Sequence, residues 1–147
     1  MESFIAVREL SVGAFLEALG ARTPAPASGA AAALTGAFAA ALVELAARFA
    51  DDEAAVTRAK ALSSRLTQLA EEDSAAYTAF METRSDEARR LTIEVPNEIA
   101  ASAAEVEQLA RKVRAQLTSS VAGDAEAAEE LARAAARVAR RLAELNA

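Results

Sequence analysis

The sequence predicts an all-α protein, a helical bundle of about five to six helices around a buried central helix of small residues. Alanine supplies 43 of the 147 residues, and alanine is the strongest helix former. Aromatic residues make up only 4% of the chain, and the β-branched residues that favour strands are scarce. Residues 1–147 are therefore expected to form one domain, long enough to bury a core of its own.

The first helix is expected to begin at Ser11 and to stop at Gly20, because glycine commonly follows a helix end. A turn with two closely spaced prolines, Pro24 and Pro26, comes next. Each proline fixes its own φ and pushes the preceding residue out of the helical region, so this turn should be extended. Ser28 then stands where its hydroxyl can accept from the first amides of a new helix, and we expect it to cap that helix.

The central helix is predicted to run from about Ser28 to Ala50. Small residues recur along it at a spacing that lets neighbouring helices approach closely. They are Gly29, Ala33, Gly36 and Ala40. The uncharged run of residues 23–43 approaches the length of a membrane span. Because it consists mostly of alanine and glycine and begins with two prolines, a helix buried in a bundle is expected instead, and no membrane partner.

The next helix should begin behind an aspartate and be long. Asp51 or Asp52 is placed to cap it, and the helical pattern continues to about Thr83. Its apolar residues recur at three- and four-residue steps, which predicts one face turned to the core. The expected core positions are Val56, Leu62, Leu66, Leu69, Ala76 and Phe80.

The last two segments follow a polar break at residues 84–86. The first should reach about Leu117, and Pro96 predicts a kink in it or a boundary between two helices. Asp124 is expected to cap the final helix. The stripe of that helix expected to face the core is Ala128, Leu131, Ala135, Val138, Leu142 and Leu145.

The missing residue types exclude several kinds of site. The chain has no cysteine and no histidine, which excludes thiol nucleophiles, disulfides, Cys/His zinc sites and imidazole acid–base catalysis. The acidic run at residues 51–53 predicts no metal site, because adjacent acids at a helix start usually act as caps. Any catalysis must use carboxylates, Lys, Arg, Tyr77, hydroxyls or backbone dipoles.

The charge of the chain bears on its partners. A net charge of −6 disfavours a nucleic-acid partner, because nucleic-acid binders carry basic surfaces. No signal peptide is expected, since Glu2 stands where basic residues belong and the apolar run at residues 4–7 is too short. We therefore expect a cytoplasmic location.

The turn with the two prolines is the first candidate for a binding site. Backbone amides at a helix N-terminus can hold an anionic group, and a small-residue turn leaves room for it. This makes Pro24, Pro26, Ser28 and Gly29 the expected substrate-binding residues. The alternative interpretation is an ordinary proline-rich turn that only begins a helix.

Carboxylates inside the apolar segments are the second kind of candidate. Glu44 is the only charged residue of the central helix before Arg48. A buried carboxylate is unfavourable unless it is paired, so Glu44 should either pair with Arg48 one turn later or serve in the site with it. Asp73 raises the same question, but in a polar stretch with two glutamates a solvated surface is expected.

These motifs, in this order, resemble the cyclodeaminase/cyclohydrolase family. That family includes the cyclodeaminase domain of formiminotransferase-cyclodeaminase and bacterial methenyltetrahydrofolate cyclohydrolases. The resemblance spans nearly the whole chain. It rests on residues 15–21, residues 24–33, the acidic step and aromatic of residues 71–77, the Val-Pro segment of residues 94–100, the Gly-Asp step at residues 123–124 and the closing residues 145–146.

The turn departs from the family pattern. The family has Gly-Gly-Gly-Ser where this chain has Ala27-Ser28-Gly29-Ala30. Glycine permits a positive φ and a close approach to a ligand, and alanine at position 27 restricts both. The basic stretch that often follows the central helix is replaced by Asp-Asp-Glu at residues 51–53, and the Gly-Asn element before the Ser-Asp step is missing.

The resemblance implies a tetrahydrofolate derivative as substrate and no separate cofactor. Family members hydrolyse 5,10-methenyltetrahydrofolate to 10-formyltetrahydrofolate, or cyclise formiminotetrahydrofolate with loss of ammonia. A carboxylate near the cationic one-carbon unit can stabilise its charge and accept a proton from water. The resemblance gives this catalytic role to Asp124, for which a helix cap is the alternative role.

The sequence supports three hypotheses about function. The first is a folate enzyme that forms a homodimer, as the family implies and as the small apolar residues of the central helix favour, since they need a second surface to cover them. The second is a non-catalytic relative that serves as a helical dimeric scaffold or ligand-binding protein. The third is an unrelated bundle that shares only the alanine-rich composition.

Overall fold

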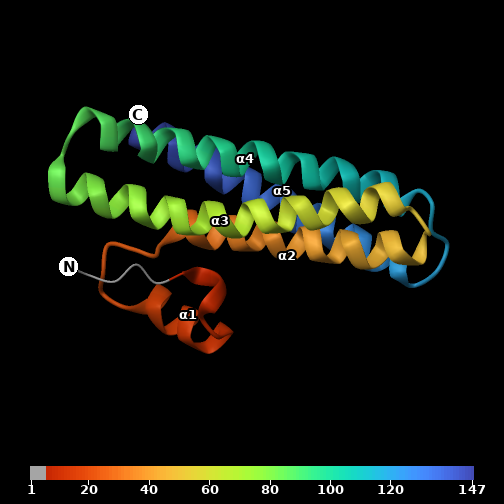
Figure 1. The fold of residues 1–147 in the computed structure, drawn as a ribbon. Coiled ribbons are helices and arrows are strands. Elements are labelled where there is room, and N and C mark those ends of the chain that lie inside the picture. The colour runs from red at the N-terminus through yellow and green to blue at the C-terminus, as the bar shows by residue number, and fades with distance from the viewer. Residues whose placement is uncertain (1–5) are drawn as a thin grey trace.

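Four long helices lie side by side, and a short helix lies outside them along the first half of α2 (Figure 1). This computed structural model describes residues 6–147. The elements are the 3-10 turn η1 (Val7–Glu9) and the helices α1 (Val12–Gly20), α2 (Ser28–Phe49), α3 (Glu53–Thr83), α4 (Asp86–Arg114) and α5 (Val121–Asn146). The predicted all-α class is confirmed, and the described chain contains no strand.

Two of the predicted helix caps are confirmed. The hydroxyl of Ser11 accepts a hydrogen bond from the amide of Ala14 at 3.0 Å, and Asp52 accepts from the amide of Ala55 at 3.0 Å. In both places a side-chain oxygen satisfies an amide that the first turn leaves unpaired.

Two other predicted caps are wrong. Ser28 is the first residue of α2, and the residue before it, Ala27, has no side-chain cap to offer. Asp124 lies inside the first turn of α5, which begins at Val121 behind Ser120. In both cases the polar residue was expected just before the helix, and the structure places it inside the helix. Asp124 therefore interacts with the positive end of the helix dipole and does not cap an amide.

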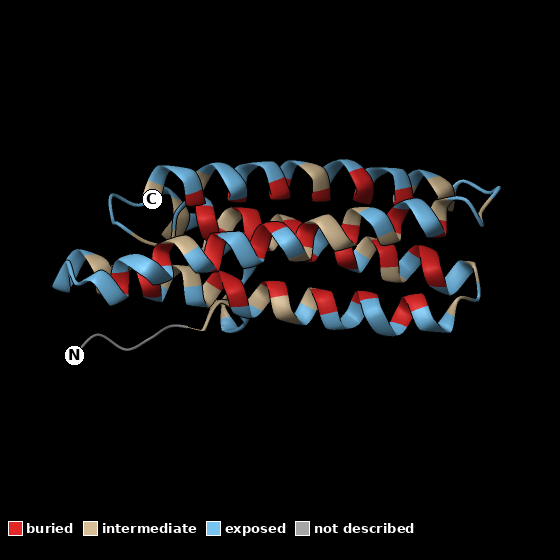
Figure 2. Cartoon of the chain, turned by 90° about the horizontal axis from the view of Figure 1, so that it is seen from above, coloured by how far each residue is buried: buried red, intermediate tan, exposed pale blue. Residues whose placement is uncertain are grey.

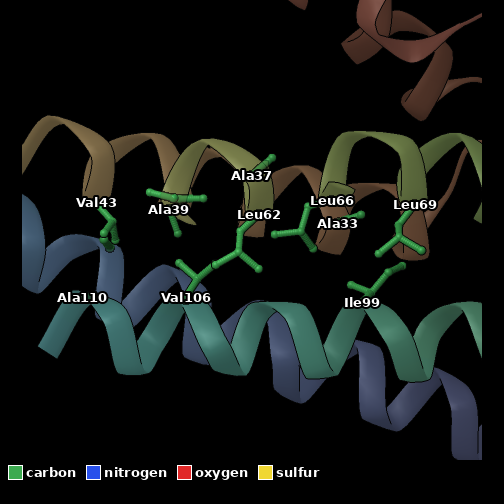
Figure 3. Close-up of a cluster of buried hydrophobic side chains, with 14 of the residues drawn as sticks. Ala33, Ala37, Ala39, Val43, Leu62, Leu66, Leu69, Ile99, Val106 and Ala110 are labelled. Atoms are coloured by element: carbon green, nitrogen blue, oxygen red, sulfur yellow. The ribbon is translucent and has the colours of Figure 1, made fainter. Parts of the chain in front are cut away.

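The core forms where α2 is enclosed by α3, α4 and α5. The buried positions of all four helices turn toward the inside of the bundle (Figure 2). Leu62, Leu66 and Leu69 of α3 meet Ile99 and Val106 of α4 (Figure 3). Small residues of α2 allow this close packing: a Cβ atom on Gly36 would lie 3.2 Å from a methyl carbon of Leu66.

The helix α2 is long and apolar enough to cross a membrane by length and composition alone. Its mean hydropathy reaches 1.8, and 56% of the apolar window is buried against the rest of the structure. Because more than half of this apolar window is buried, α2 has the position of a core helix. The sequence predicts the same position for it.

The predicted core stripes are partly wrong. In α3, Phe80 is only half-buried, and the guanidinium of Arg84 lies 5.1 Å from its ring centre. In α5, the large residues Leu131, Val138 and Leu145 are exposed. The face that packs inward consists mostly of alanines, because small side chains let α5 approach its neighbours closely. Those residues are Ala125, Ala128, Ala132, Ala135, Ala136, Ala139 and Ala143.

The helix α4 continues through Pro96, so the predicted boundary between two helices is wrong. In a regular helix the carbonyl of Thr92 would accept from the amide four residues later, and Pro96 has no amide hydrogen. The side chain of Asn146, at the end of α5, donates to this carbonyl at 2.8 Å. A side chain distant in sequence thus replaces the hydrogen bond that proline removes.

This replacement can be measured by a double-mutant cycle. Asn146→Ala should lower the free energy of unfolding by about 1–2 kcal/mol, because it leaves the Thr92 carbonyl without a donor. In the Pro96→Ala background the same change should have almost no effect, since the new amide of residue 96 takes over. Urea denaturation followed by circular dichroism gives all four values. If Asn146→Ala lowers the free energy of unfolding equally in the parent and in Pro96→Ala, Asn146 does not compensate for Pro96.

Candidate functional site

The candidate site lies where the extended turn meets the first turn of α2. The turn contains a cis peptide bond between Ala25 and Pro26, and α2 begins at Ser28. Ala27 has a φ of −142°, outside the left-handed region that favours glycine. The backbone therefore accommodates alanine here without strain, although the family that this chain resembles has glycine.

Gly29 is the position beside this turn where glycine leaves room for a neighbouring side chain. A Cβ atom on Gly29 would overlap the carboxylate of Asp73, which reaches it from α3. Glycine thus makes the space in which this carboxylate touches the first turn of α2. The structure brings Asp73 to the predicted binding turn, whereas its acidic neighbours in the sequence predict a solvated surface. That expectation is wrong, because Asp73 is half-buried and its carboxylate lies against Gly29.

Backbone amides lie beside this carboxylate. Gly29 and Ala30 are buried, and no hydrogen bond within residues 6–147 uses the amide of Ser28, Gly29 or Ala30. Unpaired amides at the positive end of a helix dipole attract a negatively charged or polar acceptor group. The start of α2 therefore combines donors with a carboxylate in one small space.

Burial raises the pKa of Asp73 to about 6. Desolvation is the cause of this shift, and no neighbouring cation in the described chain offsets it. A carboxyl group with a pKa near neutrality is present in both protonation states close to pH 7. Such a group suits general acid–base catalysis.

Two further polar residues of α3 follow Asp73. The hydroxyl oxygen of Ser74 is buried and has no hydrogen-bond partner within the described residues. Tyr77 is one helical turn beyond Asp73, so the two share a face of α3, and Tyr77 is partly exposed. Its hydroxyl can donate or accept a hydrogen bond.

Glu44 and Arg48 form an ion pair, with Arg48 Nη2 2.7 Å from Glu44 Oε2. Of the two roles that the sequence leaves open for Glu44, the pairing is confirmed. Glu44 lies roughly 22 Å beyond Gly29 along α2, at 1.5 Å per residue. It therefore does not belong to the site at the turn, and it lines a separate polar cleft of about 280 Å³ beside α3.

Asp124 lies at the opposite end of the bundle. The side chain of Gln116, after the end of α4, donates to Asp52 before α3 at 3.0 Å, and α5 begins close by at Val121. Figure 1 shows this end of the bundle far from the turn that precedes α2. Within one chain, the structure does not bring Asp124 together with Gly29.

Structural ion pairs occupy α4 and α5 near that end. The buried carboxylate of Glu129 lies 2.8 Å from Arg111, 3.0 Å from Arg114 and 3.2 Å from Arg133. The hydrogen bond from Arg111 and the charges of the three arginines lower the pKa of Glu129. A carboxylate that is held ionised in this way joins the two helices and is a poor proton acceptor.

Comparison with known proteins identifies a family and a fold. The family model described as formiminotransferase-cyclodeaminase matches residues 11–147. The crystal structure of formiminotetrahydrofolate cyclodeaminase from Thermotoga maritima is similar to this structure, with a TM-score of 0.90 and 23% sequence identity. The match covers 95% of this chain and 79% of that chain. At this identity the likeness establishes the fold. No curated protein matches the chain.

The raised pKa of Asp73 predicts how stability changes with pH. The folded protein binds one more proton than the unfolded chain between pH 3.8 and about 6, so the free energy of unfolding falls as the pH rises through this window. Asp73→Asn removes the ionised form, and this variant should be more stable than the parent above pH 6, by on the order of 2 kcal/mol.

Urea denaturation at pH 4, 6 and 8 measures this difference. The exposed Asp86 provides the matched control, because Asp86→Asn relieves no burial and should not reproduce the stabilisation above pH 6 expected of Asp73→Asn. A constant difference between Asp73→Asn and the parent at all three pH values would show that Asp73 has an ordinary pKa.

Proposed function

We propose, since the chain belongs to the formiminotransferase-cyclodeaminase family, that it binds a tetrahydrofolate derivative and transforms its one-carbon unit. The reaction is the cyclisation of formiminotetrahydrofolate with loss of ammonia, or the hydrolysis of 5,10-methenyltetrahydrofolate to 10-formyltetrahydrofolate. The observation that carries this proposal is the half-buried carboxylate of Asp73 against Gly29, at the start of α2.

Asp73 supplies the proton transfer that either reaction needs. In the cyclisation, N10 of the folate attacks the formimino carbon, and its proton must reach the departing nitrogen, which leaves as ammonia. In the hydrolysis, water adds to the methenyl carbon and must lose a proton. A carboxyl group with a pKa of about 6 can accept and return these protons near neutral pH. When ionised, it also stabilises the cationic amidinium of the methenyl group.

The turn positions the ligand for this chemistry. The prolines Pro24 and Pro26 keep the backbone extended in front of α2. The amides of Ser28, Gly29 and Ala30 offer donors for polar groups of the ligand. We assign the catalytic role to Asp73 and not to Asp124, because Asp124 lies at the other end of the bundle.

We also propose that the protein is a homodimer. Phe38, Leu45 and Phe49 are 59%, 41% and 63% exposed, and their spacing places them on one face of α2. A second copy would cover this apolar face. Light scattering should give about twice the 15.2 kDa of one chain, and Phe38→Asp should restore the mass of one chain. A parent protein with the mass of one chain would exclude the dimer.

Enzyme assays with purified protein test the proposed function. Both reactions change the amount of 5,10-methenyltetrahydrofolate, so its absorbance reports the rate against the uncatalysed background. Asp73→Asn should lower the rate by about 10²- to 10⁴-fold, the usual loss for a general acid–base group. The matched control Asp124→Asn should stay within a few-fold of the parent.

Two results would contradict this assignment. A large loss in Asp124→Asn together with an active Asp73→Asn would transfer the role to the other aspartate. Background rates for both reactions in the parent protein would favour the non-catalytic relative, a scaffold or ligand-binding protein.

A further inference from the structure

The helix α1 is attached to the bundle mainly at its two ends. Before it, the amide of Arg8 in η1 donates to Glu71 of α3 at 3.4 Å, and after it the turn of residues 21–27 leads into α2 (Figure 1). Between these points, no hydrogen bond or ion pair in the described part of the chain joins α1 to another helix. No residue of α1 is fully buried, and the one that packs against the core is Phe15.

An apolar cleft of about 310 Å³ lies between α1 and the first half of α2. Each of the two helices lines it with four residues at positions i, i+3, i+4 and i+7, which is the spacing of a helix face that packs against another helix. Val12 and Leu16 of α1 are 70% and 60% exposed, so much of this apolar face is in contact with water. The stripe of α1 is Val12, Phe15, Leu16 and Leu19, and the stripe of α2 is Ala31, Leu34, Thr35 and Phe38.

Two matched stripes with an open cleft between them describe a helix that is only partly docked. Because the removal of apolar surface from water is favourable, movement of α1 onto α2 would be stabilised. The backbone can bend at both ends of α1. Leu10 is extended between η1 and α1, and the hydrogen bonds of Thr23 go to Ala21 and Ala25, within the turn itself. Short connections of this kind absorb the movement of a rigid element.

From this arrangement we infer that α1 is a lid, which closes by moving its apolar stripe onto that of α2. Leu19, in the last turn of α1, and Ala31 of α2 both line the cleft. Ala31 directly follows the three amides, of residues 28–30, that take part in no hydrogen bond within residues 6–147. Closure therefore brings the end of α1 over the start of α2 and shields these amides from water. This movement goes beyond the proposed function and does not depend on which ligand binds.

A disulfide across the cleft tests the closure, because the chain has no cysteine of its own. Leu16→Cys with Thr35→Cys places one thiol in the middle of each stripe. A disulfide needs Cα atoms roughly 4.4–6.8 Å apart, so it forms only when the two helices meet. Mild oxidation should give an intrachain disulfide, which is seen as a faster-migrating single-chain band on a gel without reductant.

The matched control is Glu17→Cys with Thr35→Cys. Glu17 is exposed and follows Leu16 directly, but the helical period turns it away from the stripe, so this pair should stay reduced. Circular dichroism of the reduced variants checks that they fold. Leu19→Cys with Ala31→Cys provides a second pair across the cleft if the first does not fold.

Hydrogen exchange followed by NMR then tests whether the closed helix covers the start of α2. In the disulfide form, the amides of residues 28–30 should exchange on the order of tenfold more slowly than in the same protein with reductant. An interchain disulfide would overturn the inference, because a second copy would then occupy the cleft. A folded variant that forms no disulfide would show that α1 does not close. An intrachain disulfide with unchanged exchange at residues 28–30 would show that α1 is no lid over this end of α2.

Discussion

The close approach of α2 to α3 determines both the core and the candidate site. At Gly36 the absence of a side chain lets Leu66 pack against the helix, with a methyl carbon 3.2 Å from where a Cβ would be. At Gly29 the same absence makes room for the carboxylate of Asp73. Small residues on α2 thus let a leucine pack closely in the middle of the helix and let a half-buried carboxylate reach its N-terminal end. The burial in turn raises the pKa of Asp73 to about 6.

The sequence predicts the existence and approximate bounds of the helices well, because helix propensity is local, although two of the expected caps and the break at Pro96 are wrong. Ser11 and Asp52 cap helices as expected, since each precedes a clear apolar pattern. The faces of α5 are predicted less well, because large residues such as Leu131 suggest a core that alanines occupy instead. How closely two helices approach is a property of both partners, and the periodicity of one helix does not reveal it.

The candidate site is predicted only in part, because it also depends on how closely two helices approach. The turn and Gly29 are recognisable from prolines and small residues, but Asp73 is assigned to a surface from its acidic neighbours. A better signal was present: Asp73 lies four residues after Leu69 and three before Ala76, on the predicted core stripe of its helix. Asp124 is favoured by resemblance alone, and only the arrangement of helices shows that it lies far from the turn.

The proposed function requires that a folate binds at the start of α2 beside Asp73. The most direct test is to record backbone amide NMR shifts while the protein is titrated with 5-formyltetrahydrofolate. The largest shifts are expected at Ser28, Gly29 and Ala30 and at residues of α3 around Asp73. Shifts confined to the end of the bundle that holds Asp124, with the amides of residues 28–30 unchanged, would contradict it.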